Sequence, residues 1–70
     1  MAKVVLYEHG CPNCLRLKSM LDKKHIQYED ITDQNLMIEM GFKSAPKLEV
    51  DGVIMDFKDA KKWVEEQNNG

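Results

Sequence analysis

Two cysteines, Cys11 and Cys14, stand in the segment "HGCPNCLRLKSML" with two residues between them. They are the only thiols of the 70-residue chain. A cysteine sulfur can attack a disulfide or bind a soft metal ion as the thiolate, and two cysteines can also form a structural bridge. The spacing therefore leaves three chemistries open: a redox pair, part of a metal site, or a permanent disulfide.

The compartment and the loop size both argue against a permanent disulfide. The stretch "MAKVVLYEHG" lacks the long apolar run of a secretory signal, and no segment reaches the length of a membrane span. We therefore expect a cytoplasmic protein without a membrane partner, in a compartment where thiols are kept reduced. A bridge across two residues would also close too small a loop to constrain the unfolded chain much.

The elements around the cysteines predict how they are positioned. Residues 3–7, "KVVLY", form a nearly unbroken apolar run rich in β-branched side chains, which is typical of a strand buried on both faces. From Pro12 onward, Cys14 and Leu17 recur at helical spacing on one face. Pro12 suits the first helical position, so Cys11 becomes the N-cap. At that end of a helix the dipole favours an anion, and we expect it to lower the pKa of the Cys11 thiol.

The rest of the chain predicts three further strands and two further helices. A strand is expected at 26–31, followed by a short helix that is capped by Thr32 or Asp33 and ends at Gly41. Strands at 46–50 and 53–55 should form a hairpin that turns at "DG", and Asp56 should cap the last helix. The first β-α-β unit should pair its strands in parallel. The fold class is α/β: a β-α-β-α-β-β-α chain with a four-stranded mixed sheet flanked by helices, in one domain spanning residues 1–70. That order is the thioredoxin-like fold in its smallest form.

These positions divide the chemistry between the two thiols. Cys11, partly exposed at the cap, is expected to attack a substrate disulfide and form a mixed disulfide. Cys14, almost one turn further along and on the apolar face, is expected to be buried and to displace the product from Cys11. Pro12 and Asn13 form the turn between them.

A second informative segment is "SAPKL", in which Pro46 opens a predicted strand. A proline at that position marks either a sheet edge or a cis peptide bond. We expect a cis bond between Ala45 and Pro46, which would turn the backbone of Ala45 toward an extended peptide substrate.

Taken together, these segments resemble the glutaredoxin family over nearly the whole chain. The similarity rests on "VVLYEHGCPNC", "GFKSAPKLEVDG" and a final helix containing "KKWVEE". It implies thiol–disulfide exchange with glutathione as co-substrate and with no bound cofactor or metal. The residues at the family's functional positions are Cys11, Pro12, Asn13 and Cys14 in the active-site turn, and Lys43, Ala45 and Pro46 around the substrate. "GFKSAP" is also similar to the redoxins of ribonucleotide reductase, so the implied reductant is glutathione or thioredoxin reductase.

Three departures from the family's pattern bear on glutathione binding. Asn13 replaces a tyrosine, "MDFKDA" stands where a Gly-Gly pair is usual, and Glu8 stands where the family carries a basic residue. Glu8 is either a carboxylate that opposes thiolate formation or a solvated loop charge. Lys43 is either a clamp for a carboxylate of glutathione or a surface charge.

Metal binding remains the alternative chemistry. Zinc normally needs four ligands, and the two histidines do not stand at zinc-finger spacing. His25 is expected to lie at the far end of the helix from Cys11. A Cu(I) carrier that uses the two cysteines alone is therefore kept as the alternative function. His9 is expected either to tune the thiol or to face solvent.

Charge and size limit the remaining partners. The chain has 10 basic and 12 acidic residues, mixed along its length, and a net charge of −2. It lacks the basic stripe that binds phosphate backbones, so nucleic acid is not an expected partner. We expect a monomer that acts on disulfide-containing proteins or on glutathione.

Overall fold

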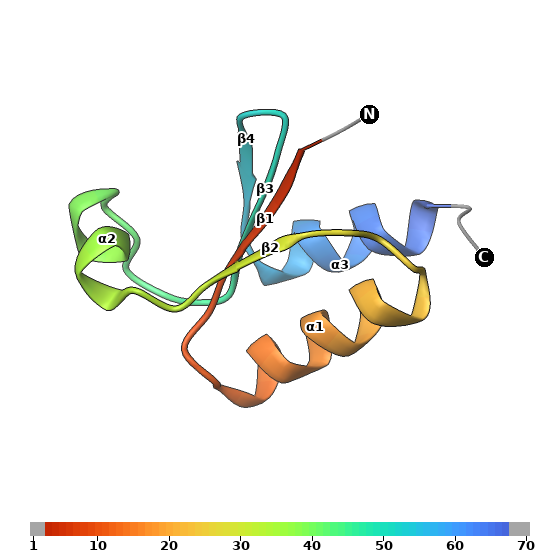
Figure 1. Ribbon diagram of the computed structural model, residues 1–70, viewed down its shortest axis with the longest axis horizontal. Helices are drawn as coiled ribbons and strands as arrows, with labels where there is room; N and C mark the ends of the chain where they lie inside the picture. The colour runs from red at the N-terminus through yellow and green to blue at the C-terminus, as the bar shows by residue number, and fades with distance from the viewer. Residues whose placement is uncertain (1–2, 68–70) are drawn as a thin grey trace.

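The computed structural model describes residues 3–67, which form one four-stranded sheet with helices on both faces (Figure 1). The elements are β1 (Val4–Tyr7), α1 (Pro12–Lys23), β2 (Glu29–Ile31), α2 (Gln34–Glu39), β3 (Lys47–Val50), β4 (Val53–Met55) and α3 (Phe57–Glu66). The strand order is β2-β1-β3-β4, with β1 parallel to β2 and antiparallel to β3. The predicted element order, mixed sheet and thioredoxin-like fold are confirmed.

β1 lies in the middle of the sheet and separates two apolar cores. All four of its residues are buried, as the unbroken apolar run predicts. Because side chains alternate along a strand, Val4 and Leu6 enter one core, while Val5 and Tyr7 enter the other. The strand therefore holds both helical layers in place.

The larger core is filled by α1 and α3, which lie side by side on one face of the sheet (Figure 1). α1 contributes Leu17 and Leu21, both fully buried, and α3 contributes Ala60 and Val64. Trp63, which is partly buried, packs against this core. The smaller core lies on the opposite face, under α2.

Capping residues set the ends of the helices. Asp33 accepts hydrogen bonds from the second and third backbone N–H groups after it, and the Asp56 carboxylate accepts one from Asp59, so both act as the predicted N-caps. Gly41 ends α2 with a φ of 80°. The hairpin between β3 and β4 turns through Asp51 and Gly52, which both have positive φ, the geometry that two-residue hairpin turns favour.

The second strand is shorter than the sequence predicts. It begins at Glu29 and not at residue 26, because the residues after α1 are used to end the helix. His25 adopts a φ of 57°, and the N–H groups of His25 and Ile26 donate to the carbonyls of Asp22 and Leu21. This is the Schellman arrangement, and it buries Ile26 in the larger core.

No helix within residues 3–67 is long and apolar enough to cross a membrane.

Candidate active site

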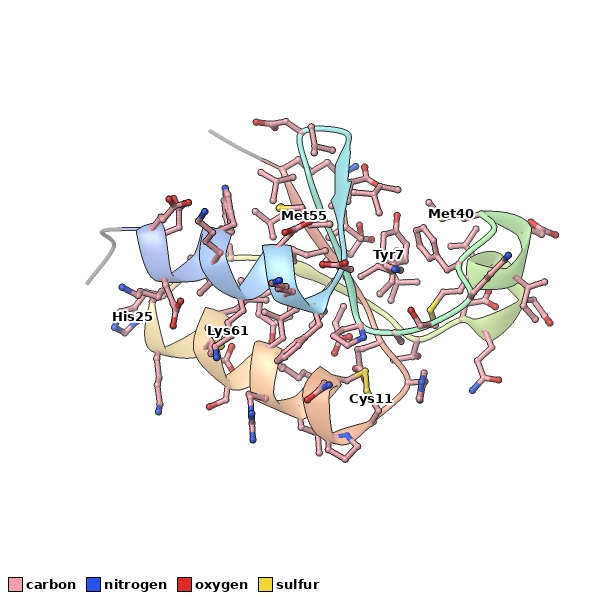
Figure 2. The ribbon with its side chains drawn as sticks, turned by 180° about the vertical axis from the view of Figure 1, so that it is seen from behind. Tyr7, Cys11, His25, Met40, Met55 and Lys61 are labelled. Atoms are coloured by element: carbon pink, nitrogen blue, oxygen red, sulfur yellow. A yellow bond between two sulfur atoms is a disulfide. The ribbon has the colours of Figure 1, made fainter. Side chains whose placement is uncertain are left out.

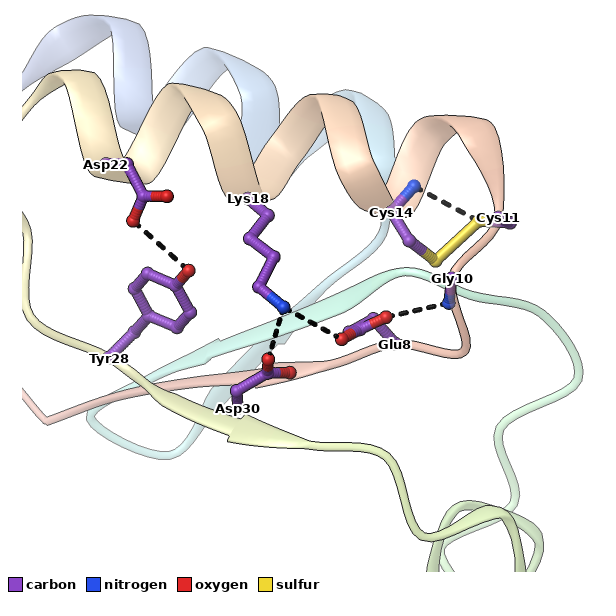
Figure 3. A network of polar contacts seen from close by, with 8 residues as sticks. All are labelled: Glu8, Gly10, Cys11, Cys14, Lys18, Asp22, Tyr28 and Asp30. Atoms are coloured by element: carbon purple, nitrogen blue, oxygen red, sulfur yellow. Dashed lines mark hydrogen bonds and ion pairs between the residues drawn. A yellow bond between two sulfur atoms is a disulfide. The ribbon is translucent and has the colours of Figure 1, made fainter.

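A disulfide joins Cys11 to Cys14 at the start of α1 (Figures 2 and 3). Cys11 is the N-cap, as predicted: its sulfur accepts the backbone N–H of Cys14 at 3.1 Å, and its carbonyl accepts that of Leu15 at 3.0 Å. Cys14 is completely buried, whereas Cys11 is only partly so. Pro12 and Asn13 are the first two helical residues, and both are exposed. The two cysteines therefore differ in solvent exposure, as expected.

The loop before β3 brings its backbone against the disulfide. The Ala45–Pro46 peptide bond is cis, which confirms the prediction, and Pro46 is fully buried. The carbonyl oxygen of Ala45 lies 3.8 Å from the sulfur of Cys11. A disulfide sulfur carries no proton, so this is a packing contact in the oxidised state. In the dithiol state the Cys11 thiol can donate a weak hydrogen bond to the same oxygen.

Glu8 lies beneath the disulfide and is 5% exposed. One carboxylate oxygen accepts the Gly10 N–H at 2.7 Å, and the other lies 3.4 Å from the ammonium nitrogen of Lys18. Lys18 in turn pairs with Asp30 on β2 at 2.6 Å (Figure 3). The interpretation of Glu8 as a solvated loop charge is therefore wrong, because the side chain turns inward to bind the loop backbone.

The charged pair below the site is stabilised in its ionised form. Burial by itself raises the pKa of Asp30, but its hydrogen bond with the Lys18 ammonium group and the positive charge of that group outweigh burial and lower that pKa below its ordinary value. The hydrogen bond with Asp30 in turn raises the pKa of Lys18. The Lys18–Asp30 pair therefore remains charged at neutral pH.

An open pocket of about 170 Å³ lies between His9, α2 and the loop of residues 42–45. Met37 and Phe42 supply apolar surface, and the ring of Phe42 packs edge-on against Tyr7 with the ring centroids 5.1 Å apart. Lys43 and Ala45 line the same pocket. The structure thus places two of the substrate residues expected from the sequence, Lys43 and Ala45, in one pocket, and Ala45 also contacts Cys11. The apolar lining by Met37 and Phe42 is not predicted from the sequence.

His9 is exposed, yet its ring lies close to both sulfurs. A ring nitrogen and the sulfurs of Cys11 and Cys14 all lie within 4.8 Å of one another. The sequence predicts His9 only as a charge near the thiol or as a solvent-facing residue. The spacing His-x-Cys-x-x-Cys is the signal that points to its place beside the sulfurs. His25 lies at the opposite end of α1 from Cys11, as expected (Figure 2).

Fold and site together define the class: a thioredoxin-like domain with a Cys-x-x-Cys disulfide at the start of its first helix. Comparison with known proteins agrees with this. The Leishmania protein TDR1, described as a unique trimeric glutathione transferase, superposes with a TM-score of 0.74 at 19% identity. That superposition covers 93% of this chain and 17% of TDR1, and at this identity it establishes the fold alone.

Part of the sequence is similar to a glutaredoxin. It is 54% identical to Glutaredoxin 1 of Rickettsia bellii over 26 residues. That match covers 37% of this chain and 26% of the length of Glutaredoxin 1. No family model matches the chain.

Proposed function

We propose that this protein is a glutaredoxin-type thiol–disulfide oxidoreductase that reduces protein disulfides or mixed disulfides with glutathione. The observation that carries the proposal is the unequal setting of its two sulfurs. Cys11 is partly exposed and accepts a backbone N–H, while Cys14 is fully buried and already bonded to Cys11. The similarity to Glutaredoxin 1 supports the same activity.

The proposed reaction consists of two exchanges that each conserve one disulfide bond. The Cys11 thiolate attacks one sulfur of the substrate, forms a mixed disulfide and releases the other sulfur as a thiolate. Cys14 then gives up its proton and attacks the sulfur of Cys11. The Cys11–Cys14 disulfide forms, and the second substrate sulfur leaves and takes up a proton. The substrate gains two electrons from the protein. One of its sulfurs takes up the proton that Cys14 releases, and the thiolate that left first takes up a proton from the solvent.

A thiol reductant must then reopen the Cys11–Cys14 bond. Two molecules of glutathione supply the two electrons and leave as glutathione disulfide, or thioredoxin reductase supplies them from its own dithiol. The protein itself carries the electrons, so the cycle uses no resident cofactor.

The cis-proline loop and the pocket are the proposed platform for the substrate. The carbonyl of Ala45 faces Cys11, so an extended chain laid beside Pro46 would pass the reactive sulfur. Lys43 supplies a cation for a carboxylate, as at the end of glutathione, and Met37 and Phe42 offer apolar contact. Asn13, exposed in the turn, would border the same substrate.

The test is a coupled reduction assay with two electron sources. The metal-free protein is supplied either with glutathione, glutathione reductase and NADPH, or with thioredoxin reductase and NADPH. A small mixed disulfide of glutathione and an inter-chain protein disulfide serve as substrates. We expect turnover with at least one source, and inactivity with both would contradict the proposal.

Two serine variants assign the roles. Cys11→Ser should abolish reduction of both substrates, because the attacking sulfur is lost. Cys14→Ser should accumulate a mixed disulfide with the protein substrate, visible by mass spectrometry. It should retain turnover of the glutathione substrate, since free glutathione can resolve the intermediate. Full activity of Cys11→Ser would show that the roles are assigned wrongly.

A further inference from the structure

The reduced form of the active site contains three ligand atoms suited to one soft metal ion. The two sulfurs and a ring nitrogen of His9 lie within 4.8 Å of one another. They come from one short segment, residues 9–14, at the junction of the loop after β1 and the first turn of α1. The sulfur of Cys14 forms the buried floor, Cys11 lies partly exposed, and His9 is open to solvent.

The size of this cluster fits a single ion. Two thiolates bound to one closed-shell ion at about 2.3 Å each lie about 4 Å apart. Once the disulfide is reduced, the sulfurs need only separate to that distance, and the Cα atoms of the two cysteines are already 4.9 Å apart. The ring of His9 is near enough to complete the set without movement of the helix.

The donor set selects the kind of ion. Two thiolates and an imidazole form a soft, sulfur-rich site, which favours Cu(I). A structural zinc site has four protein ligands, whereas among residues 3–67 this cluster offers three, so zinc would need a water molecule as its fourth ligand. Cu(I) is satisfied by three ligands, so the cluster is complete for copper and incomplete for a structural zinc ion.

The surroundings hold the ligands in place and suit the charge of the complex. The loop that carries His9 is fixed on both sides: the Glu8 N–H donates to the carbonyl of Ile31 at 3.0 Å, and the Gly10 N–H donates to the Glu8 carboxylate at 2.7 Å. Cu(I) with two thiolates carries a net negative charge. The N–H of Cys14 and the positive end of α1 stabilise that charge.

We propose that the reduced protein binds one Cu(I) ion through the sulfurs of Cys11 and Cys14 and a ring nitrogen of His9. Binding requires that a thiol or phosphine reductant first convert the disulfide to two thiols by adding two electrons and two protons. Each thiol that is still protonated then releases its proton as it binds copper. The metal and the disulfide use the same sulfurs, so copper binding and disulfide exchange exclude one another.

The experiment measures Cu(I) affinity without oxygen by competition with bathocuproine disulfonate. The protein is reduced with a phosphine, which is then removed. Wild type, His9→Asn and the matched control His25→Asn are compared; both histidines are exposed, and asparagine tolerates the positive φ of residue 25. We expect one Cu(I) per wild-type chain. Loss of a ligand should weaken binding about ten- to hundredfold in His9→Asn, by analogy with the cost of losing even an outer-shell partner, while His25→Asn should bind like wild type.

Two further measurements identify the ligands. X-ray absorption of the copper complex should show two sulfur neighbours and one nitrogen neighbour, and the nitrogen should be lost in His9→Asn. Copper should also protect both cysteines from alkylation. Equal affinity in His9→Asn and wild type, undiminished copper binding by the oxidised protein, or tight Zn(II) binding without Cu(I) binding would each overturn the proposal. None of these outcomes depends on the disulfide reductase assay.

Discussion

Glu8 fixes the backbone that leads into the first cysteine. Its carboxylate binds the N–H of Gly10, which has a φ of 82°. That left-handed conformation suits glycine, and it lets the chain turn from β1 into the N-cap position of Cys11. The same carboxylate contacts Lys18 on α1. One side chain therefore joins the end of β1, the active-site turn and the helix that carries both sulfurs.

Replacing Glu8 should therefore reduce stability in a graded way. Glu8→Ala removes the acceptor of the Gly10 N–H and should lower the free energy of unfolding by about 1.5–3 kcal/mol, the usual contribution of a hydrogen bond to a charged group. Glu8→Gln keeps an oxygen for Gly10 and should cost less. Urea denaturation of the two variants measures the difference. Equal stability of both variants would show that the hydrogen bond to Gly10 contributes nothing.

For single residues, the sequence predicts the roles that depend only on neighbouring positions in the chain. Pro12 marks the first turn of the helix, so Cys11 can be placed as N-cap, and Pro46 signals the cis bond before β3. The burial of Glu8 could not be predicted, because it depends on Lys18 and Asp30 arriving from α1 and β2. From the sequence, a lysine at position 8 would be a return to the basic residue that the resembled family carries there. In the structure it would place a second ammonium group against Lys18 in a buried site.

Among the elements, α1 carries the site, and its two faces should respond differently to the same substitution. Leu17 is fully buried in the larger core, whereas Leu15 is 56% exposed on the same helix. Leu17→Ala should cost about 2–5 kcal/mol. A domain of this size rarely has more than about 3–5 kcal/mol in total, so this variant should lose a large part of its stability.

Leu15→Ala is the matched control and should change stability by less than about 0.5 kcal/mol. Circular dichroism during thermal and urea unfolding distinguishes the two variants. Comparable losses in both would contradict the placement of α1 against the sheet.

The ion pair between β2 and α1 should make stability depend on pH in the acid range. The folded pKa of Asp30 lies below its ordinary value of 3.8. As the pH falls, the unfolded state therefore takes up the proton first, and the stabilisation is lost as the pH drops below 3.8 through the folded pKa. Asp30→Asn should thus be less stable than wild type at neutral pH, and the difference should disappear in acid.

Unfolding experiments at pH 7 and in the acid range test this prediction. Because the Asp30 side chain remains partly exposed, 1 M salt should also reduce the difference at neutral pH. A difference that is the same at every pH and salt concentration would show that Asp30 acts through packing and not through its charge.

The elements themselves are well predicted where local chemistry sets their ends. Asp33, Gly41 and Asp56 mark helix boundaries because each satisfies backbone groups that a helix leaves unpaired. The start of β2 is misplaced because His25 ends α1 in a left-handed conformation, which histidine adopts much less often than glycine. The fold of the sheet follows from the order of elements, but the pocket beside α2 depends on contacts between distant segments.

Across the whole molecule, the protection of backbone amides from hydrogen exchange should depend on where each element lies in the fold. β1 and β3 are the central strands, and β1 is buried along its length. α2 has six residues and contributes one buried side chain, Met37, to the smaller core. Because short elements with little buried surface open locally, amide hydrogen exchange followed by NMR should be slowest in β1 and β3 and much faster in α2. Exchange in α2 as slow as in β1 would contradict this prediction.

Because the two cores lie on opposite faces of β1, the layers on the two faces of the sheet can change independently in evolution. The sulfurs belong to the layer of α1 and α3, while Met37 and Phe42 of the pocket belong to the layer of α2. Mutations can remodel the α2 layer, and with it the choice of partner, while the layer that sustains the sulfur chemistry stays intact. If the proposed function holds, reactivity and selectivity are thus separately adjustable within this one domain.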